Sequence, residues 1–131
     1  MRKVIMLAVL ACLSNNVMAE WTRVGEGDNG ITMYANLATI RKRGDMAKMW
    51  ILMDFKTVQQ AESGERYLSA ENQREYNCSE EQSRRVTINW FSGNMTSGKL
   101  GFNDSSLGQW TPVRPGSLDE VWFKVACGLL K

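Results

Sequence analysis

The chain has 131 residues, with 16 Lys and Arg, 14 Asp and Glu and no histidine, so its formal charge is +2. This length suits one domain with one hydrophobic core. The absence of histidine excludes Ser-His-Asp and Cys-His catalysis and the commonest zinc sites, because each needs an imidazole. The small net charge argues against nucleic-acid binding through bulk electrostatics.

Residues 1–19 have the layout of a secretory signal peptide. Arg2 and Lys3 form a positive segment, and the apolar run from Val4 to Leu10 that follows is too short to span a bilayer. A small-x-small cleavage site ends at Ala19. Removing two of the 16 basic residues leaves 14, equal to the 14 acidic residues, so the exported protein is formally neutral.

Cys12 leaves a second route of processing open. Val9-Leu10-Ala11-Cys12 loosely fits the box at which bacterial lipoproteins are cleaved and acylated on cysteine. The apolar run before it is very short, and Ala19 offers a better cleavage site. The sequence therefore favours cleavage at Ala19, which leaves residues 20–131 as a single exported domain, with a lipid anchor at Cys12 as the alternative.

Two cysteines remain after the leader, Cys78 and Cys127. In an exported domain, a lone pair of cysteines is typical of a disulfide, whereas a redox-active pair usually has the Cys-x-x-Cys spacing. We therefore predict a Cys78–Cys127 disulfide.

The first half of the exported chain has the pattern of strands joined by turns. Trp21–Val24 is predicted as a strand, and Gly25–Gly30 as a glycine-rich turn. A half-buried strand begins at Ile31, where apolar and polar residues alternate. Arg41–Asp45 is predicted as a basic turn, and the apolar segment Met46–Lys56 as a central strand.

The second half continues with strands. Thr57–Arg66 is polar and is predicted as a loop, followed by strands at Tyr67–Cys78 and Gln82–Ser92. Met95–Phe102 is predicted as a further strand broken by glycine, and Asn103–Gln109 as a polar loop.

One helix is predicted near the end of the chain. Ser117 and Glu120 form a capping box, with Ser117 at the N-cap. Apolar residues then recur at helical spacing on one predicted inward face: Leu118, Val121, Trp122 and Val125. The fold class is therefore α+β, a small antiparallel sheet of about six strands with a C-terminal helix packed on it and one disulfide.

Gly25-x-Gly27-x-x-Gly30 matches the dinucleotide-binding fingerprint by letter. That fingerprint works by ending a strand and opening a helix whose N-terminus holds a pyrophosphate. Here the residues that follow alternate as a strand, so a turn between strands is the better interpretation. We expect no cofactor and no metal.

Four carboxylates could in principle serve as catalytic acid–base pairs: Asp54, Glu71, Glu75 and Asp119. None has a recognisable catalytic context, and Asp54 is expected to be partly buried because it follows an apolar run. We predict no catalytic residue.

Small basic clusters are the candidate binding residues. Arg41, Lys42 and Arg43 with Lys48 could contact an anionic glycan or an acidic protein surface, although solvated strand ends often have this composition. Arg84-Arg85 is a second, smaller cluster.

The chain contains five tryptophans. Trp50, Trp90 and Trp122 have the spacing of core residues. Trp21 and Trp110 lie near the ends of predicted elements, where each could contact a partner or cover the core.

A series of short motifs runs through the exported chain in a fixed order. It comprises Trp21-x-x-Val24-Gly25, Tyr34, Ile40-Arg41-Lys42-x-Gly44, Trp50-x-Leu52-x-Asp54-Phe55-Lys56, Tyr67-Leu68-Ser69, Glu75-Tyr76-x-Cys78, Phe91-Ser92-x-x-Met95-x-x-Gly98, Trp110-x-x-Val113-x-Pro115-Gly116-Ser117 and Cys127. In this order the chain resembles the bacterial surface-adhesin protein E family. Asn77 and Asn36 stand where the family pattern suggests aspartate.

The resemblance implies an antiparallel sheet with a helix against it, a disulfide, and homodimers as one state of assembly. It also implies an extracellular-matrix or envelope protein as partner, but it transfers no ligand-binding residue, because adhesion depends on surface residues of individual members. We predict a non-enzymatic, exported, adhesin-like binding module that contacts a protein or glycan at the periplasm or outer surface. The alternative is a periplasmic accessory or inhibitor protein that binds an envelope component.

Overall fold

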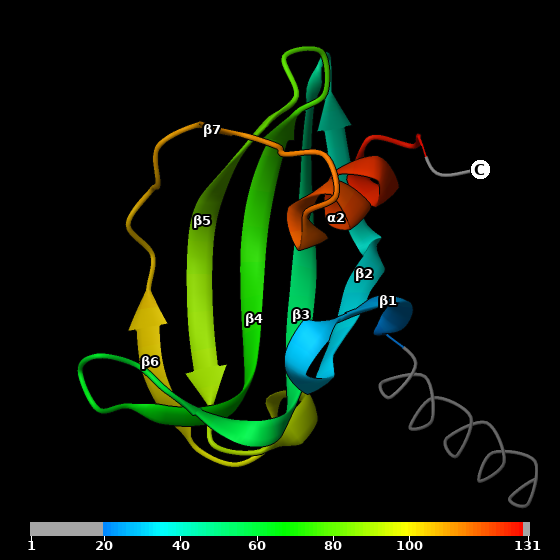
Figure 1. Ribbon diagram of the computed structural model, residues 1–131. Coiled ribbons are helices and arrows are strands. Elements are labelled where there is room, and N and C mark those ends of the chain that lie inside the picture. The colour runs from blue at the N-terminus through cyan, green and yellow to red at the C-terminus, as the bar shows by residue number, and fades with distance from the viewer. Residues whose placement is uncertain (1–19, 130–131) are drawn as a thin grey trace, which may run out of the picture.

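The fold is built on long strands that pair with one another in chain order. The computed structural model describes residues 20–129, in which an antiparallel sheet carries one α-helix on one side (Figure 1). The predicted signal peptide and Cys12 lie outside the described residues. The prediction of an antiparallel sheet with one helix and one disulfide is confirmed.

Six strands follow one another across the sheet in the order β1-β2-β3-β4-β5-β6, and a short seventh strand, β7, pairs with β5. Their bounds are β1 Thr22–Gly27, β2 Ile31–Arg43, β3 Met46–Gln60, β4 Arg66–Asn77, β5 Gln82–Phe91, β6 Leu100–Asp104 and β7 Thr111–Pro112. A short 3₁₀ turn, η2, spans Asp28–Gly30 between β1 and β2. Each neighbouring pair along the main path is antiparallel, so every connection is a hairpin.

Two predicted connections are shorter than the sequence indicated. The loop predicted over Thr57–Arg66 is reduced to residues 61–65, because β3 continues to Gln60 and β4 begins at Arg66. β2 continues through Arg43 and β3 begins at Met46, so only Gly44 and Asp45 reverse the chain. Gly44 has φ +59°, a conformation that glycine adopts at little cost. The predicted basic turn is therefore the end of a strand, and its charged side chains alternate between the two faces of the sheet.

The prediction of a strand over Met95–Phe102 is wrong in its first half. Asn94–Thr96 form a 3₁₀ turn, η3, in which Met95 has φ 54° and Thr96 has φ 62°. Polar groups of β3 hold this turn, because Asp54 Oδ1 accepts from Met95 N at 2.7 Å and from Asn94 Nδ2 at 3.1 Å. These contacts join residues about 40 positions apart, beyond the reach of a local sequence pattern.

The helix α2 spans Leu118–Ala126 and lies against β1, β2 and β3 (Figure 1). Ser117 is its N-cap and accepts from Glu120 N at 3.2 Å, as the predicted capping box requires. Trp122 is 4% exposed, and its Nε1 donates to Tyr34 O at 3.0 Å. In residues 20–129 no helix is long and apolar enough to cross a membrane.

The inward face of α2 is rotated from the predicted one. Its buried residues are Trp122, Phe123 and Ala126, whereas Leu118, Val121 and Val125 are only partly buried. Phe123 contacts Tyr76 edge-to-face, with ring centroids 6.0 Å apart. The core beneath the helix is formed by side chains from the central strands: Met33, Ala35, Ala47, Met49, Ile51 and Tyr76.

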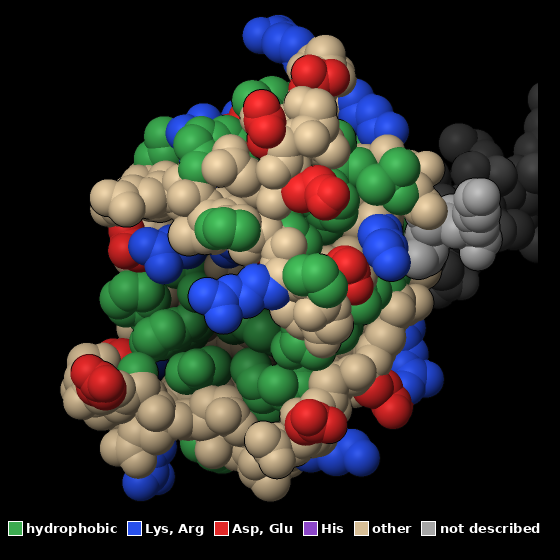
Figure 2. All heavy atoms as spheres, turned by 45° about the horizontal axis from the view of Figure 1, so that its top comes forward, with side chains coloured by type: hydrophobic (Ala, Val, Ile, Leu, Met, Phe, Trp, Pro, Cys, Tyr) green, Lys and Arg blue, Asp and Glu red, His purple; other side chains and the backbone are tan. Residues whose placement is uncertain are grey.

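A row of aromatic rings continues on the same face of the sheet beyond the helix. Trp90 lies opposite Ala70, which shares a face of β4 with Tyr76. The Trp90 ring stacks between Tyr67 and Phe102, with centroids 4.5 and 4.4 Å apart. These rings are half-buried, and Figure 2 shows hydrophobic side chains gathered in a hollow on this face. Of the three tryptophans predicted in the core, only Trp122 is fully buried.

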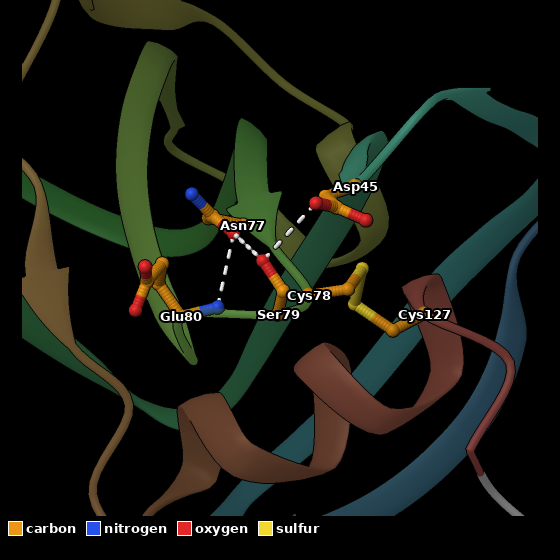
Figure 3. The surroundings of a disulfide bond; sticks show 6 residues. All are labelled: Asp45, Asn77, Cys78, Ser79, Glu80 and Cys127. Atoms are coloured by element: carbon orange, nitrogen blue, oxygen red, sulfur yellow. Dashed lines mark hydrogen bonds between the residues drawn. A yellow bond between two sulfur atoms is a disulfide. The ribbon is translucent and has the colours of Figure 1, made fainter.

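The disulfide joins the end of β4 to the end of α2 (Figure 3). The Cα atoms of Cys78 and Cys127 are 5.8 Å apart, within the usual range for a disulfide. Asn77, where the family pattern suggests aspartate, accepts from Glu80 N at 3.0 Å and thereby closes the following turn. An amide oxygen can accept this backbone hydrogen bond as a carboxylate oxygen would.

Candidate functional site

The predicted basic residues line a groove at the β2–β3 end of the sheet. The groove has a volume of about 590 Å³. Its lining comprises Arg41, Lys42, Arg43, Met46, Ala47, Lys48, Gln73 and Glu75. All four basic residues proposed from the sequence, Arg41, Lys42, Arg43 and Lys48, therefore contribute to one concave surface.

Strand register divides these four residues between the two faces of the sheet. Arg41 lies opposite Lys48, on the face away from α2, and Arg43 lies opposite Met46 on that same face. Lys42 lies opposite the buried core residue Ala47. Its Nζ is 3.0 Å from the position that a Cβ on Gly128 would occupy, so its ammonium lies beside the end of α2. Three cations thus share the groove face, whereas Lys42 borders the groove but its ammonium lies on the opposite side of the sheet.

A bulge in β2 positions Arg41. The regular pairing with β3 stops after Asn36 and resumes at Arg41. Within this bulge, Thr39 Oγ1 donates to Asn36 O at 2.6 Å and accepts from Trp50 N at 3.0 Å, so a side chain replaces a backbone partner in the ladder. Arg41 Nη1 donates to Ala38 O and Ile40 O, both at 3.0 Å. The guanidinium is therefore held in place before any ligand binds.

The floor of the groove carries a carboxylate that is already neutralised. Glu75 Oε1 lies 2.6 Å from Arg84 Nη2 and accepts from Arg84 Nε at 2.8 Å. The Arg84 guanidinium in turn lies over the Trp110 ring, 4.4 Å from its centroid. Within residues 20–129, no carboxylate lies within ion-pair distance of Arg41, Arg43 or Lys48. The groove therefore offers uncompensated positive charge.

The second basic cluster does not form a surface of its own. Arg84 pairs with Glu75 on one face, whereas Arg85 pairs with Asp104 at 3.4 Å on the other. Neighbouring residues of a strand point to opposite sides, so Arg84 and Arg85 cannot contact one ligand together.

The candidate carboxylates are each engaged by a structural partner. Asp54, half-buried as predicted, holds the η3 turn. Glu71 accepts from Asn89 Nδ2 at 3.0 Å, and Glu75 pairs with Arg84. Asp119 accepts from Ser83 Oγ at 2.5 Å. Hydrogen bonds and ion pairs therefore account for all four carboxylates.

The glycine motif serves packing between β1 and α2. Gly25 and Gly27 lie within β1, and the turn that follows is η2. A Cβ on Gly27 would lie 2.9 Å from Leu118 Cδ2, so a side chain there would require the Leu118 side chain to move. The segment that matches the dinucleotide-binding fingerprint leads into η2 and β2, so it opens no α-helix whose N-terminus could bind a pyrophosphate.

The chain matches the surface-adhesin protein E family over residues 21–128. It belongs to the surface-adhesin protein E family. The match covers the whole sheet, α2 and both cysteines of the disulfide, so the resemblance drawn from the motifs is confirmed.

Solved structures of Haemophilus influenzae protein E have the same fold. Crystal form II has a TM-score of 0.65 at 10% identity, covering 83% of this chain and 87% of that one. A second structure of that protein has a TM-score of 0.62, again at 10% identity, with 83% and 84% covered. Protein E from non-typeable Haemophilus influenzae has a TM-score of 0.60 at 10% identity, with 83% and 76% covered. No curated protein matches this chain.

The sequence missed one group of residues that the structure brings together. Trp21, Asn36, Trp50 and Glu71 border a second hollow on the same face as the basic groove. They lie on four different segments of the chain, and the cross-strand pairs Asn36–Trp50 and Leu52–Glu71 set their positions. The tryptophans and Glu71 were visible separately in the sequence, but their proximity depends on sheet register.

Proposed function

We propose that this chain is an exported, non-enzymatic binding module with adhesin-like function, formed by residues 20–131 as a single domain after a leader of residues 1–19. Its partner is a protein or a glycan at the bacterial envelope or outer surface, contacted through the basic groove. Membership of the surface-adhesin protein E family supports this function. The observation that carries the site is the sharing of one groove by Arg41, Arg43 and Lys48, without a carboxylate partner among the described residues.

Charge decides the class of surface that the groove would bind. Three cations on two adjacent strands attract carboxylates or sulfates, and Arg41 is already held by backbone carbonyls, which lowers the entropic cost of binding. Such contacts raise the association rate and weaken as salt screens them. An anionic partner surface is therefore expected.

The test compares two matched variants on an immobilised polyanion. Heparin serves as the sulfated-glycan probe and polyglutamate as the acidic-polypeptide probe. Replacing Arg41, Arg43 and Lys48 with Gln should weaken binding at low salt about tenfold or more and flatten its salt dependence. Lys56→Gln removes one charge at an exposed position outside the groove lining and should change affinity by less than about threefold.

Melting temperatures of both variants check that the fold is retained. Unchanged binding of the triple variant to both probes would rule out the groove as the contact surface. Cell fractionation addresses location separately, because exposure at the outer surface fits an adhesin and a soluble periplasmic pool fits an accessory protein.

A further inference from the structure

The second hollow lies beside the basic groove but has a different chemistry. Its volume is about 390 Å³. The lining comprises Glu20, Trp21, Asn36, Thr39, Trp50, Glu71 and Thr96. Carboxylates and indole rings replace the cations of the groove, so the two concave surfaces suit ligands of opposite charge.

The carboxylates of the hollow have no cation of their own. Glu71 is half-buried and uses Oε1 to accept from Asn89 Nδ2 at 3.0 Å. Among residues 20–129, neither Glu71 nor Glu20 lies within ion-pair distance of a Lys or Arg. Trp21 and Trp50 are also half-buried, and indole faces attract cations.

Asn36 also lines the hollow, and its side-chain oxygen is buried beneath the surface. The residue is 9% exposed, and its side-chain Oδ1 is buried without a hydrogen-bond partner within the described part of the chain. Buried polar atoms are normally paired, and an unpaired one is costly.

Strained backbone forms another part of the wall. Thr96 has φ 62° and follows Met95 at φ 54°, so two consecutive residues with side chains adopt a left-handed conformation. Ser69 Oγ accepts from Thr96 N at 3.0 Å and donates to Gly93 O at 2.7 Å, which holds the turn against β4. Strain of this kind persists where the surroundings enforce it and is frequent at binding sites.

We infer that this hollow binds an alkylammonium group. Its positive charge complements the Glu71 carboxylate and the indole rings of Trp21 and Trp50, which line the hollow. An anion would face Glu20 and Glu71 without a cation to offset them. The inference is independent of the basic groove.

Two sources can supply this group. One is a free amine from the surroundings. The other is the chain itself, because Glu20 lines the hollow, and cleavage after Ala19 would convert its backbone nitrogen into an α-ammonium group. The experiment therefore uses the exported protein that begins at Glu20, and the same protein with Gly-Ser inserted before Glu20 to displace the terminal amine.

Butylammonium chloride is titrated into both forms while the indole N–H signals are followed by ¹⁵N NMR. The signals of Trp21 and Trp50 are assigned with Trp21→Phe and Trp50→Phe, and those of Trp90 and Trp122 serve as internal references. Butanol, which has the same alkyl chain without the charge, is the control ligand. Butylammonium should shift the Trp21 and Trp50 signals, and butanol should not.

Glu71→Gln tests the charge while keeping an oxygen that accepts from Asn89. It should weaken butylammonium binding about tenfold, and Glu81→Gln at the exposed β4–β5 turn should have no effect. Binding to both forms assigns the site to an external amine, whereas binding to the extended form alone assigns it to the chain's own terminus. No shift in either form, or an equal response to butanol, would overturn the inference.

Discussion

Tyr76 in β4 and Asp119 in α2 lie 43 residues apart in the chain, and the Tyr76 hydroxyl donates to Asp119 Oδ1 at 3.3 Å. Ser83 Oγ donates to the other carboxylate oxygen at 2.5 Å, and Arg74 Nε lies 3.5 Å from Oδ1. One carboxylate in the first turn of the helix thereby collects partners from β4 and β5. This polar contact fixes where the helix begins on the sheet.

Stability should fall at alkaline pH because of Tyr76. Burial, and then the charge of Asp119, raise the pKa of Tyr76 well above its usual value near 10. Above pH 10 the unfolded chain loses this proton while the folded chain keeps it, so the free energy of unfolding decreases as pH rises, by up to about 1.4 kcal/mol per pH unit. Below pH 10 this contribution is constant.

Urea unfolding of the wild type and of Tyr76→Phe at a series of pH values above 9 checks this expectation. The variant loses a hydrogen bond, so it should be less stable at neutral pH by about 1 kcal/mol, but its alkaline slope should be shallower. Identical slopes in the two proteins would contradict the assignment to Tyr76.

Asp119→Ala should destabilise the fold by about 1–3 kcal/mol, because the Tyr76 and Ser83 hydroxyls lose their acceptor. The Asp119 side chain is 27% exposed, which places the expected cost below that of a fully buried charge. Chemical denaturation measures the change. Glu62→Ala, in the exposed loop between β3 and β4, is the matched control and should be nearly neutral.

Trp122→Ala should cost about 3–5 kcal/mol of stability, since it removes the largest side chain of the helix from the core and leaves a cavity. Leu37→Ala, at a position 47% exposed in the β2 bulge, should cost far less. Thermal or urea unfolding distinguishes the two. A Trp122→Ala variant with an unchanged melting temperature would show that this side chain does not support the fold.

The Cys78–Cys127 bond should protect the fold against unfolding. Its residues are separated by 49 positions, so the chain-entropy estimate of its contribution is about 4 kcal/mol. Thiol labelling of exported protein, unfolded without reductant, should detect no free sulfhydryl. The Cys78→Ser and Cys127→Ser double variant should unfold at a markedly lower urea concentration, and equal midpoints would contradict the prediction.

Local sequence patterns predicted the strands and the helix start, which are determined by interactions between residues close together in the chain. Alternation of apolar and polar residues located β2 and β5 approximately, the apolar run Met46–Lys56 located β3, and the Ser117–Glu120 capping box located the start of α2. The pairing of Cys78 with Cys127 followed from their number and the export signal. These features depend on residues within a few positions of one another, or on having no other partner available.

Local sequence patterns did not predict the features that depend on contacts between distant segments of the chain. The η3 turn is held by Asp54 and Ser69 from two other strands, so its residues alone resembled a strand. The inward face of α2 includes Phe123 because the Phe123 ring packs edge-to-face against the Tyr76 ring of β4. Lys42 was grouped with Arg41 by adjacency, although neighbouring strand residues point to opposite faces.

The position of the disulfide also bears on resistance to proteases. Cys78 and Cys127 enclose the chain segment that contains β5, β6 and β7 together with the exposed loop around Leu107, which is 59% exposed. A protease at an outer surface would cut first in such a loop. Both fragments would then remain covalently joined through sulfur, so a nicked molecule would keep its sheet and helix together until it met a reductant.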